Sequence, residues 1–250
     1  MQEHQPELRA RIDTLLNHFI KRFYAESPAA RHLREAASVD LEMFKGHTVQ
    51  TILRIRLARM ADAKALLLFA KSDPIAAQRW AKYAEEEMLH DKLFLKDLKK
   101  LGMEEAAIYA TEPFLATKLL QGYLYYTLEH EGPMGLIAKA YFLEYTSRAT
   151  QSEWNANIRK SLGPDAVRGA DAHINIDIGE DHSTDVWNVL ASLVNGPKDE
   201  ARLEAHIHTF FGLFSAYFAD LARVPTGASA GLMQTPIDAV RSSATPPAVS

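Results

Sequence analysis

Apolar residues recur at intervals of three and four along almost the whole chain, which is the spacing of amphipathic helices. The pattern predicts helices over residues 6–26, 40–70, 73–102, 113–131, 133–162, 164–195 and 197–223. Asp73 and Pro74 supply an N-cap followed by proline at the first helical position, and Gly-Pro pairs separate the later helices. No segment alternates with period two, so no strand is expected. The pattern therefore predicts an all-α fold.

The composition changes after Arg223. Residues 225–250 are rich in proline, alanine, serine, threonine and glycine, which is typical of a flexible tail. The connections between the predicted helices are short, and no internal repeat is found. We therefore expect one compact domain of about seven helices over residues 1–224, followed by a flexible tail over 225–250.

Composition narrows the function classes. The chain has 250 residues, a formal net charge of −4 and no cysteine, and its pI is about 6.2. This charge argues against nucleic acid or an anionic membrane as the main partner. No apolar run approaches the ~20 residues that span a bilayer, and the N-terminus lacks signal-peptide features, so we expect a cytoplasmic protein. Without thiolates, any metal must be held by nitrogen and oxygen, which suits iron, manganese or zinc.

Residues 173–182 are the most unusual stretch of the sequence. They place five metal-capable side chains within three helical turns: His173, Asp177, Glu180, Asp181 and His182. Three isoleucines are interleaved with these groups. Ionisable side chains beside a core must be paired, neutral or bound to a metal. The stretch therefore predicts part of a metal site, with a solvated acidic helix carrying scattered histidines as the alternative.

The geometry of this stretch leaves its last ligand open. His173 and Asp177 share a helix face, and Glu180 completes that line. His182 falls about 180° from His173 on a regular helix, yet it is in phase with the apolar stripe that follows it. Both histidines face the core if one extra residue is accommodated near Gly179, as in a π-bulge. We favour His182 on the stripe argument; in a regular helix, Glu180 would replace it.

A second candidate lies in the Glu-x-x-His sequence of the 73–102 helix. Glu87 and His90 are three residues apart, so they share a face, and the periodicity places that face on the apolar side. The same periodicity places Glu86 and Asp97 on a solvated face. The alternative interpretation of the motif is a charged helix face with a core histidine.

Glu144 is the third candidate, because it is enclosed by apolar neighbours in the 133–162 helix. A carboxylate in such a stretch usually has a partner. That partner is either a metal or Arg148, one turn later. The full candidate set suits two iron ions with bridging carboxylates, and it comprises Glu87, His90, Glu144, His173, Asp177 and His182, with Glu180 and Asp181 as further candidates.

Over roughly residues 40–220 this pattern resembles the haem-oxygenase-like di-iron oxidases and oxygenases. The resemblance implies a seven-helix haem-oxygenase-like fold, two bound Fe²⁺ ions and O2 as co-substrate. It also implies a natural-product biosynthetic enzyme that N-oxygenates an amino acid, or cleaves a C–C bond of an acid or desaturates it. Two departures stand out. The spacing from Asp177 to His182 is longer than the usual one, and Glu42 and Asp62 are the only acidic candidates for an extra ligand on the 40–70 helix.

Two other functions remain open. A ferritin-like di-iron protein that handles iron would need a second Glu-x-x-His, whereas Glu180, Asp181 and His182 form only Glu-x-His. A metal-free helical binding or cofactor-biosynthesis protein of the same fold would pair the carboxylates with arginines. We expect a small-molecule substrate, an external electron donor and, from base rates, a homodimer. No residue indicates the substrate.

Overall fold

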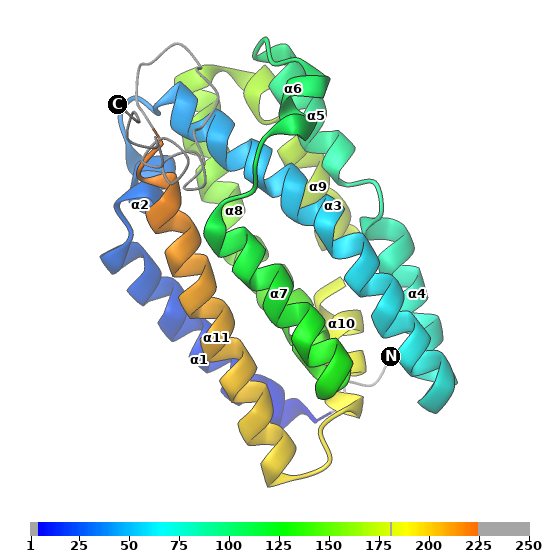
Figure 1. Cartoon of the computed structure of the whole chain (residues 1–250). Helices are drawn as coiled ribbons and strands as arrows, with labels where there is room; N and C mark the ends of the chain where they lie inside the picture. The colour runs from blue at the N-terminus through cyan, green and yellow to red at the C-terminus, as the bar shows by residue number, and fades with distance from the viewer. Residues whose placement is uncertain (1–4, 181, 225–250) are drawn as a thin grey trace, which may run out of the picture.

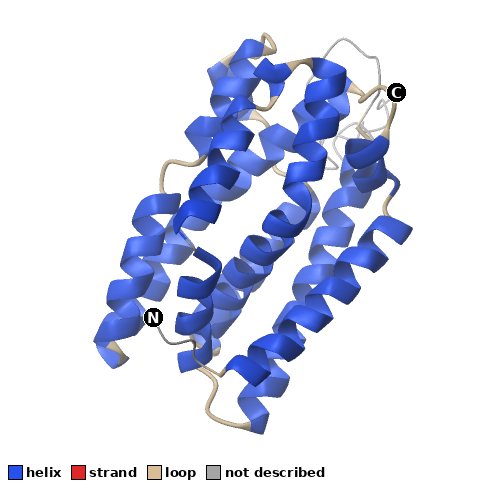
Figure 2. Cartoon of the chain, turned by 180° about the vertical axis from the view of Figure 1, so that it is seen from behind, coloured by secondary structure: helices blue, strands red, loops and turns tan. Residues whose placement is uncertain are grey.

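The computed structural model describes residues 5–180 and 182–224, and for 175–180 it describes the backbone alone. Within these ranges the chain is helical and contains no strand (Figure 2), so the predicted all-α class is confirmed. The predicted tail at 225–250 lies outside the described residues.

The described chain contains more helical segments than the seven expected. They are α1 (Pro6–Glu26), α2 (Pro28–Glu35), α3 (Leu41–Ser72), α4 (Pro74–Glu87), α5 (Asp91–Lys100), α6 (Glu105–Ala110), α7 (Leu115–His130), α8 (Met134–Leu162), the 3-10 turn η1 (Pro164–Ala166), α9 (Arg168–Glu180), α10 (His182–Ser192) and α11 (Pro197–Leu221). The short helices α2 and α6 were not predicted, because six to eight residues carry too little periodic pattern. The other starts and ends lie close to the predicted ones, except that the predicted 164–195 helix consists of η1, α9 and α10, with residue 181 outside the described residues.

Local chemistry explains the starts of two of these helices. The Asp73 side chain accepts hydrogen bonds from the backbone N–H groups of Ile75 and Ala76, as expected of an N-cap. Asp40 caps α3 in the same way, accepting from Met43 N at 2.8 Å. The predicted 73–102 helix is wrong in one respect, since it is interrupted between Glu87 and Asp91.

The long helix α8 is the central element of the fold. It packs against α1, α2, α3, α7, α9, α10 and α11. Figure 1 shows α1 and α11 along one side of the molecule, α3 and α7 across the front, and α4 at the opposite side from α1. Because α8 contacts most of the other helices, a polar residue on its inward face lies deep inside the bundle.

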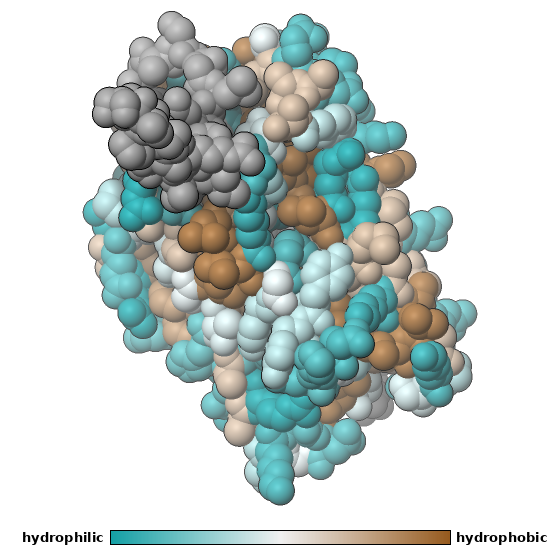
Figure 3. Space-filling view, viewed as in Figure 1, coloured by the Kyte–Doolittle hydropathy of each residue, from teal (hydrophilic) through white to brown (hydrophobic). Residues whose placement is uncertain are grey.

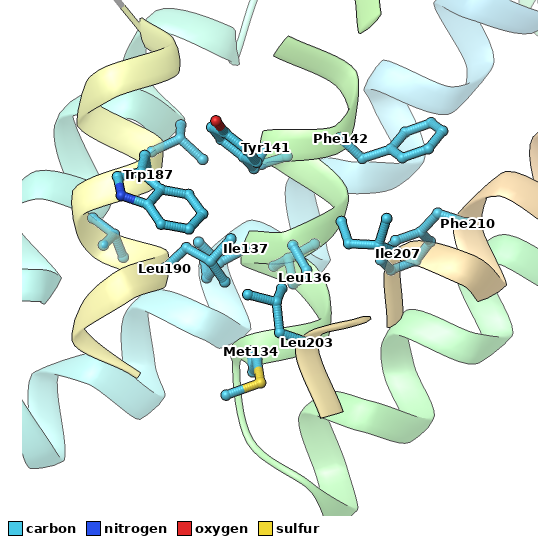
Figure 4. Close-up of a cluster of buried hydrophobic side chains, with 14 of the residues drawn as sticks. Met134, Leu136, Ile137, Tyr141, Phe142, Trp187, Leu190, Leu203, Ile207 and Phe210 are labelled. Atoms are coloured by element: carbon cyan, nitrogen blue, oxygen red, sulfur yellow. The ribbon is translucent and has the colours of Figure 1, made fainter. Parts of the chain in front are cut away.

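Two groups of buried apolar side chains form the interior. The first surrounds the N-terminal half of α8, where Ile137 and Tyr141 lie beside Trp187 of α10, and Phe142 lies beside Phe210 of α11 (Figure 4). The second gathers side chains from α2, α3, α5, α9 and the end of α11. Each fully buried aliphatic or aromatic side chain contributes roughly 1.5–3 kcal/mol to folding.

The outer surface mixes hydrophilic and hydrophobic residues, as Figure 3 shows for one face. Met60, Leu67 and Ile75 are among the exposed apolar side chains of α3 and α4. No helix in the described ranges is long and apolar enough to cross a lipid bilayer.

Candidate metal centre

Five of the six predicted ligands lie together. Glu87 ends α4, His90 lies in the turn before α5, Glu144 is on α8, His173 is on α9 and His182 begins α10. The sixth, Asp177, has no described side chain, and neither have the further candidates Glu180 and Asp181. Four separate segments of the chain thus contribute to one cluster.

The cluster consists of two groups that share a carboxylate. Ligand atoms of Glu87, His90 and His173 lie within 4.8 Å of one another, and so do ligand atoms of Glu87, Glu144 and His182. Metal bonds to nitrogen and oxygen of about 2.0–2.2 Å, as in zinc proteins, put opposite ligands of one ion about 4.4 Å apart. Each group is therefore compact enough to close on one ion, and Glu87 is placed to serve both.

The hydrogen bonding of two of these atoms supports this assignment. Glu87 Oε1 and His90 Nδ1 are buried and have no hydrogen-bond partner. They lie 3.0 Å apart, within ion-pairing distance of each other. Buried polar atoms that lack partners cost stability, and a bound cation would satisfy both atoms together. The two atoms are therefore placed as nitrogen and oxygen ligands of a metal ion would be.

A tightened turn between α4 and α5 brings His90 to the cluster. His90 N donates to Glu87 O at 3.2 Å and Lys92 N to Leu89 O at 3.0 Å, which are i to i−3 hydrogen bonds. Such 3-10 stretches inside a helix often mark functional positions. The next residue, Asp91, is fully buried and is held by Arg59 at 2.5 Å and Arg56 at 3.4 Å. This ion pair fixes the turn beside His90.

Close contact between α5 and α9 sets the position of His173. The buried Asp97 carboxylate accepts from Gly169 N at 2.7 Å and Ala170 N at 3.0 Å, so it caps the start of α9. A Cβ at Gly169 would lie 2.0 Å from Leu93 O, so only glycine allows this approach. Burial raises the pKa of Asp97 to about 6, opposed by these two backbone hydrogen bonds.

Aromatic contacts fix the orientation of the histidine on α9. The rings of His90 and His173 are 4.6 Å apart at an angle of 72°, and Phe94 lies 5.2 Å from His173 on the other side. One turn separates the Asp97-capped start of α9 from His173. The cap and the ring contacts together therefore direct this imidazole toward Glu87.

Tyr83 positions the carboxylate on α8. Its hydroxyl donates to Glu144 Oε1 at 2.9 Å. Burial raises the pKa of Tyr83 well above its usual value, and the negative charges of Glu144 and Glu87 raise it further. The phenol therefore stays protonated and remains a donor. Glu144 is buried, and the hydrogen bond to Tyr83 is one partner that the sequence did not indicate.

The prediction for Glu86 was wrong. Its Oε2 lies 3.0 Å from His182 Nε2, whereas the periodicity had placed this residue on a solvated face. It also pairs with Lys82 at 3.3 Å, so it lies at the edge of the cluster. A carboxylate beside Nε2 fixes a ligand histidine and leaves Nδ1 for a metal. His182 Nδ1 is 4.0 Å from Glu87 Oε1.

Asp97 was also wrongly assigned to that solvated face, since it is only 2% exposed. The tightened turn at His90 changes the phase between α4 and α5, so the periodicity of one helix does not carry over to the other.

Of the two acidic candidates for an extra ligand on α3, Glu42 pairs with Lys45 at 3.2 Å. Burial raises the pKa of the other, Asp62, to about 6, which Lys139 opposes and Glu87 augments.

Two of the other histidines, His47 and His206, are engaged elsewhere. His47 Nδ1 is 2.9 Å from the Tyr217 hydroxyl, and His206 Nδ1 is 2.7 Å from the Tyr123 hydroxyl. Beyond the two groups that share Glu87, the described part of the chain contains no further set of three metal-capable side chains whose ligand atoms lie within 4.8 Å of one another. The predicted irregularity is not found at Gly179, because the backbone is α-helical through Glu180. Residue 181, between α9 and α10, lies outside the described residues, and His173 and His182 do reach the same cluster.

A cavity of about 240 Å³ adjoins the cluster, and Glu87, Glu144 and His173 line one part of it. Most of its remaining wall is apolar and is contributed by α1, α3, α8 and α11. An apolar cavity with a few polar groups is typical of a small-molecule site. The arrangement thus places nitrogen and oxygen ligands next to space for a substrate.

Comparison with known proteins identifies the fold. No family model matches the chain, and no curated protein matches it either. A solved domain of unknown function with a haem-oxygenase-like fold, from Shewanella denitrificans, is 16% identical with a TM-score of 0.77, covering 86% of this chain and 91% of that one. A TenA homologue from Pseudomonas syringae pv. tomato is 10% identical with a TM-score of 0.63, covering 84% and 92%. The chain therefore has a haem-oxygenase-like fold, and these likenesses show the fold alone.

Proposed function

We propose that this protein is a non-haem di-iron enzyme that uses O2 to oxidise a small organic substrate. The observation that carries the proposal is the pair of ligand groups that share Glu87. Carboxylates and imidazoles without thiolates are the ligands typical of iron in oxygen-dependent enzymes. Glu87 Oε1 and His90 Nδ1 are buried, lie 3.0 Å apart and have no hydrogen-bond partner, which supports a bound cation between them.

The two ions would have different protein ligands. His90 and His173 belong to one group, Glu144 and His182 belong to the other, and Glu87 belongs to both. Glu87 would therefore bridge. The second group has two supporting side chains, since Tyr83 donates to Glu144 and Glu86 lies beside His182 Nε2. Such supporting groups orient ligands and tune a bound metal.

When bound, two Fe²⁺ ions supply an O2-binding site and electrons for its reduction. Monooxygenation puts one oxygen atom into the substrate and releases the other as water, with two electrons and two protons from an external reductant. Desaturation removes two hydrogen atoms from the substrate and, with the same two electrons and two protons, yields two waters. The apolar cavity beside Glu144 would hold the substrate and exclude bulk water during either reaction.

Metal analysis with oxygen consumption tests this function. Chelator-treated full-length protein is titrated anaerobically with Fe²⁺ and then exposed to O2, while absorbance and dissolved oxygen are followed. We expect two iron ions per chain and a transient visible absorption on oxygen exposure. A protein that binds no iron would contradict the proposal.

Size-exclusion chromatography separates this function from iron storage. A storage protein would form a large iron-loaded cage, whereas we expect a small assembly that consumes O2 and a substrate together. The haem-oxygenase-like topology already differs from a four-helix cage subunit, and the described residues supply no second Glu-x-x-His. If the protein takes up many more than two iron ions per chain, iron storage would be favoured instead.

A further inference from the structure

The wall of the cavity beside the metal centre places a charged group next to several aromatic rings. The surrounding rings come from α1, α8 and α11, and they are Phe19, Phe23, Phe142, Phe211, Phe214 and Phe218. Arg54 of α3 lines the same space. A guanidinium keeps its positive charge at all ordinary pH values, so burial in such surroundings is costly unless an anion is present.

The hydrogen bonding of Arg54 is incomplete. Its Nη1 atom is buried and has no hydrogen-bond partner, while Nη2 donates to Thr51 Oγ1 at 3.1 Å. The guanidinium carbon lies 4.3 Å from the ring centroid of Tyr217 and 5.4 Å from that of Phe214. These rings orient the group but carry no negative charge. Nη1 of the guanidinium is thus left without a hydrogen-bond acceptor.

Two other arginines on α3 have a carboxylate partner, which Arg54 lacks within the described residues. Arg56 and Arg59 share the carboxylate of Asp91, at 3.4 Å and 2.5 Å. Arg54 forms no ion pair with any carboxylate of the described residues. The fork of N–H groups suits a carboxylate, which it can bind through two parallel hydrogen bonds. The carboxylate of a ligand would therefore supply the ion-pair partner that Arg54 lacks among these residues.

Helix geometry gives the separation along the α3 axis between Arg54 and the level of the metal centre. Arg59 binds Asp91, the residue after His90, so it marks the level of the ligand cluster on α3. Arg54 is five residues earlier, which is roughly 7.5 Å along the helix axis. Ile55, Ala58, Phe142 and Leu143 are among the apolar residues that line the cavity with it. A ligand held at Arg54 could therefore place an apolar segment beside Glu87 and Glu144.

From these contacts we infer that the substrate is a monocarboxylic acid with an uncharged, apolar body. Its carboxylate binds Arg54, and its body extends along the phenylalanine-lined wall toward Glu87 and Glu144. The orientation toward a metal rests on the proposed function, whereas the recognition of the carboxylate by Arg54 does not. A phosphate would carry a second charge into an apolar cavity, which favours the carboxylate.

Binding by the full-length chain, measured by calorimetry before and after chelator treatment, tests this inference without relying on iron chemistry. The probes are butanoate, octanoate and dodecanoate, with methyl octanoate, octylammonium and octyl phosphate as matched compounds of other charge. We expect octanoate to bind more tightly than butanoate, and at least about tenfold more tightly than its methyl ester or octylammonium. Tighter binding of the ester or of octyl phosphate, or no binding of any acid, would overturn the inference.

Variants locate the binding group. Arg54→Gln should weaken octanoate binding about tenfold to a hundredfold, and Arg54→Lys should restore part of it because the charge is kept without the fork. Arg11→Gln, which removes a surface arginine of α1 that pairs with Glu200, should leave binding unchanged. Lys139 also lines the cavity. If binding is lost in Lys139→Gln but kept in Arg54→Gln, the assignment to Arg54 is wrong.

The same data separate this inference from the proposed function. Acid binding that depends on Arg54 in a protein without iron would support the substrate class while the di-iron function fails. Two bound iron ions without acid binding would give the opposite result. Circular dichroism of each variant checks that lost binding does not reflect lost folding.

Discussion

Two regions of the interior both include side chains of α8, but they differ in how their buried polar groups are hydrogen-bonded. Around Ile137 and Tyr141 the side chains form a close-packed apolar cluster (Figure 4). The Tyr141 hydroxyl in this cluster is satisfied, since it donates to Asp13 at 2.5 Å and accepts from Arg9 Nε at 3.0 Å. One turn further along α8, Glu144 faces a cluster in which the buried atoms Glu87 Oε1 and His90 Nδ1 have no hydrogen-bond partner.

This difference separates residues that stabilise the fold from residues kept for binding. Close packing with satisfied polar groups is what folding alone requires. Carboxylates and imidazoles gathered around unpartnered atoms reduce stability unless a ligand compensates. Substitutions in the first region should therefore change stability and leave binding intact. Substitutions in the second should change binding and cost less stability.

The largest expected effect is the loss of both metal ions in Glu87→Ala. Glu87 belongs to both ligand groups, whereas His90 and His182 belong to one each. We expect two iron ions per chain in the wild type, close to none in Glu87→Ala, and one each in His90→Ala and His182→Ala. Metal analysis after anaerobic loading measures this series. Glu85→Ala, which changes an exposed residue of the same helix, should keep both ions. Full iron content in Glu87→Ala would rule out a shared ligand.

The converse experiment changes the apolar region. Ile137 is fully buried, so Ile137→Ala removes packed atoms and leaves a cavity. The expected loss is about 2–5 kcal/mol in the free energy of unfolding, measured by denaturant titration of the metal-free protein. Iron content of the folded variant should stay at two per chain. Leu119→Ala, at a 53% exposed position of α7, should change the free energy by less than about 0.5 kcal/mol. Loss of metal in Ile137→Ala would mean that the two regions are not separable.

Much of this comparison was accessible from the sequence, because it depends on helical periodicity. The phase of α4 identified Glu87, the apolar surroundings identified Glu144, and the isoleucine-rich stretch identified His173 and His182. All four lie in the cluster, although their role as ligands stays a prediction. The all-α class was also correct, because long amphipathic segments are the strongest sequence signal.

What the sequence could not provide is information that depends on helix irregularity and packing. The tightened turn at His90 shifts the phase of α5, so Asp97 was assigned to solvent although it caps α9. Glu86 was missed because its partner, His182, comes from a helix almost a hundred residues later. Gly169 offered a signal that was not used, since a glycine at a helix start can mark close approach of two backbones.

A smaller effect is expected from Tyr83→Phe, which tests the support of the second ligand group. The substitution removes the hydrogen bond to Glu144 Oε1 and leaves the ring in place. Loss of such a supporting group typically lowers metal affinity about tenfold to a hundredfold. Competition between the protein and a chelator of known affinity should show one ion bound more weakly and the other unchanged. Tyr126→Phe, at a 55% exposed position of α7, is the matched control. Equal weakening of both ions would contradict the division into two groups.

The smallest expected effect concerns pH and the far end of the cavity. His47 is surrounded by the rings of Trp154, Tyr217 and Phe218, and burial, with the charge of Arg54, lowers its pKa to about 3. Its ordinary pKa of 6.5 applies to the unfolded chain. As the pH falls from about 6.5 toward 3, the unfolded state binds a proton that the folded state does not. His47 therefore makes no pH-dependent contribution above this window and destabilises the fold progressively within it.

His47→Gln removes this titration and keeps a polar side chain near the Tyr217 hydroxyl. The free energy of unfolding of the metal-free variant should fall less steeply on acidification between pH 6 and pH 4, by up to about 1.4 kcal/mol per pH unit. Denaturant titrations at several pH values measure the difference from the wild type. His18→Gln, which replaces an exposed imidazole on α1, should keep the wild-type slope. An unchanged slope in His47→Gln would show that this imidazole titrates freely, and the far end of the cavity would then be wet rather than closed by its aromatic rings.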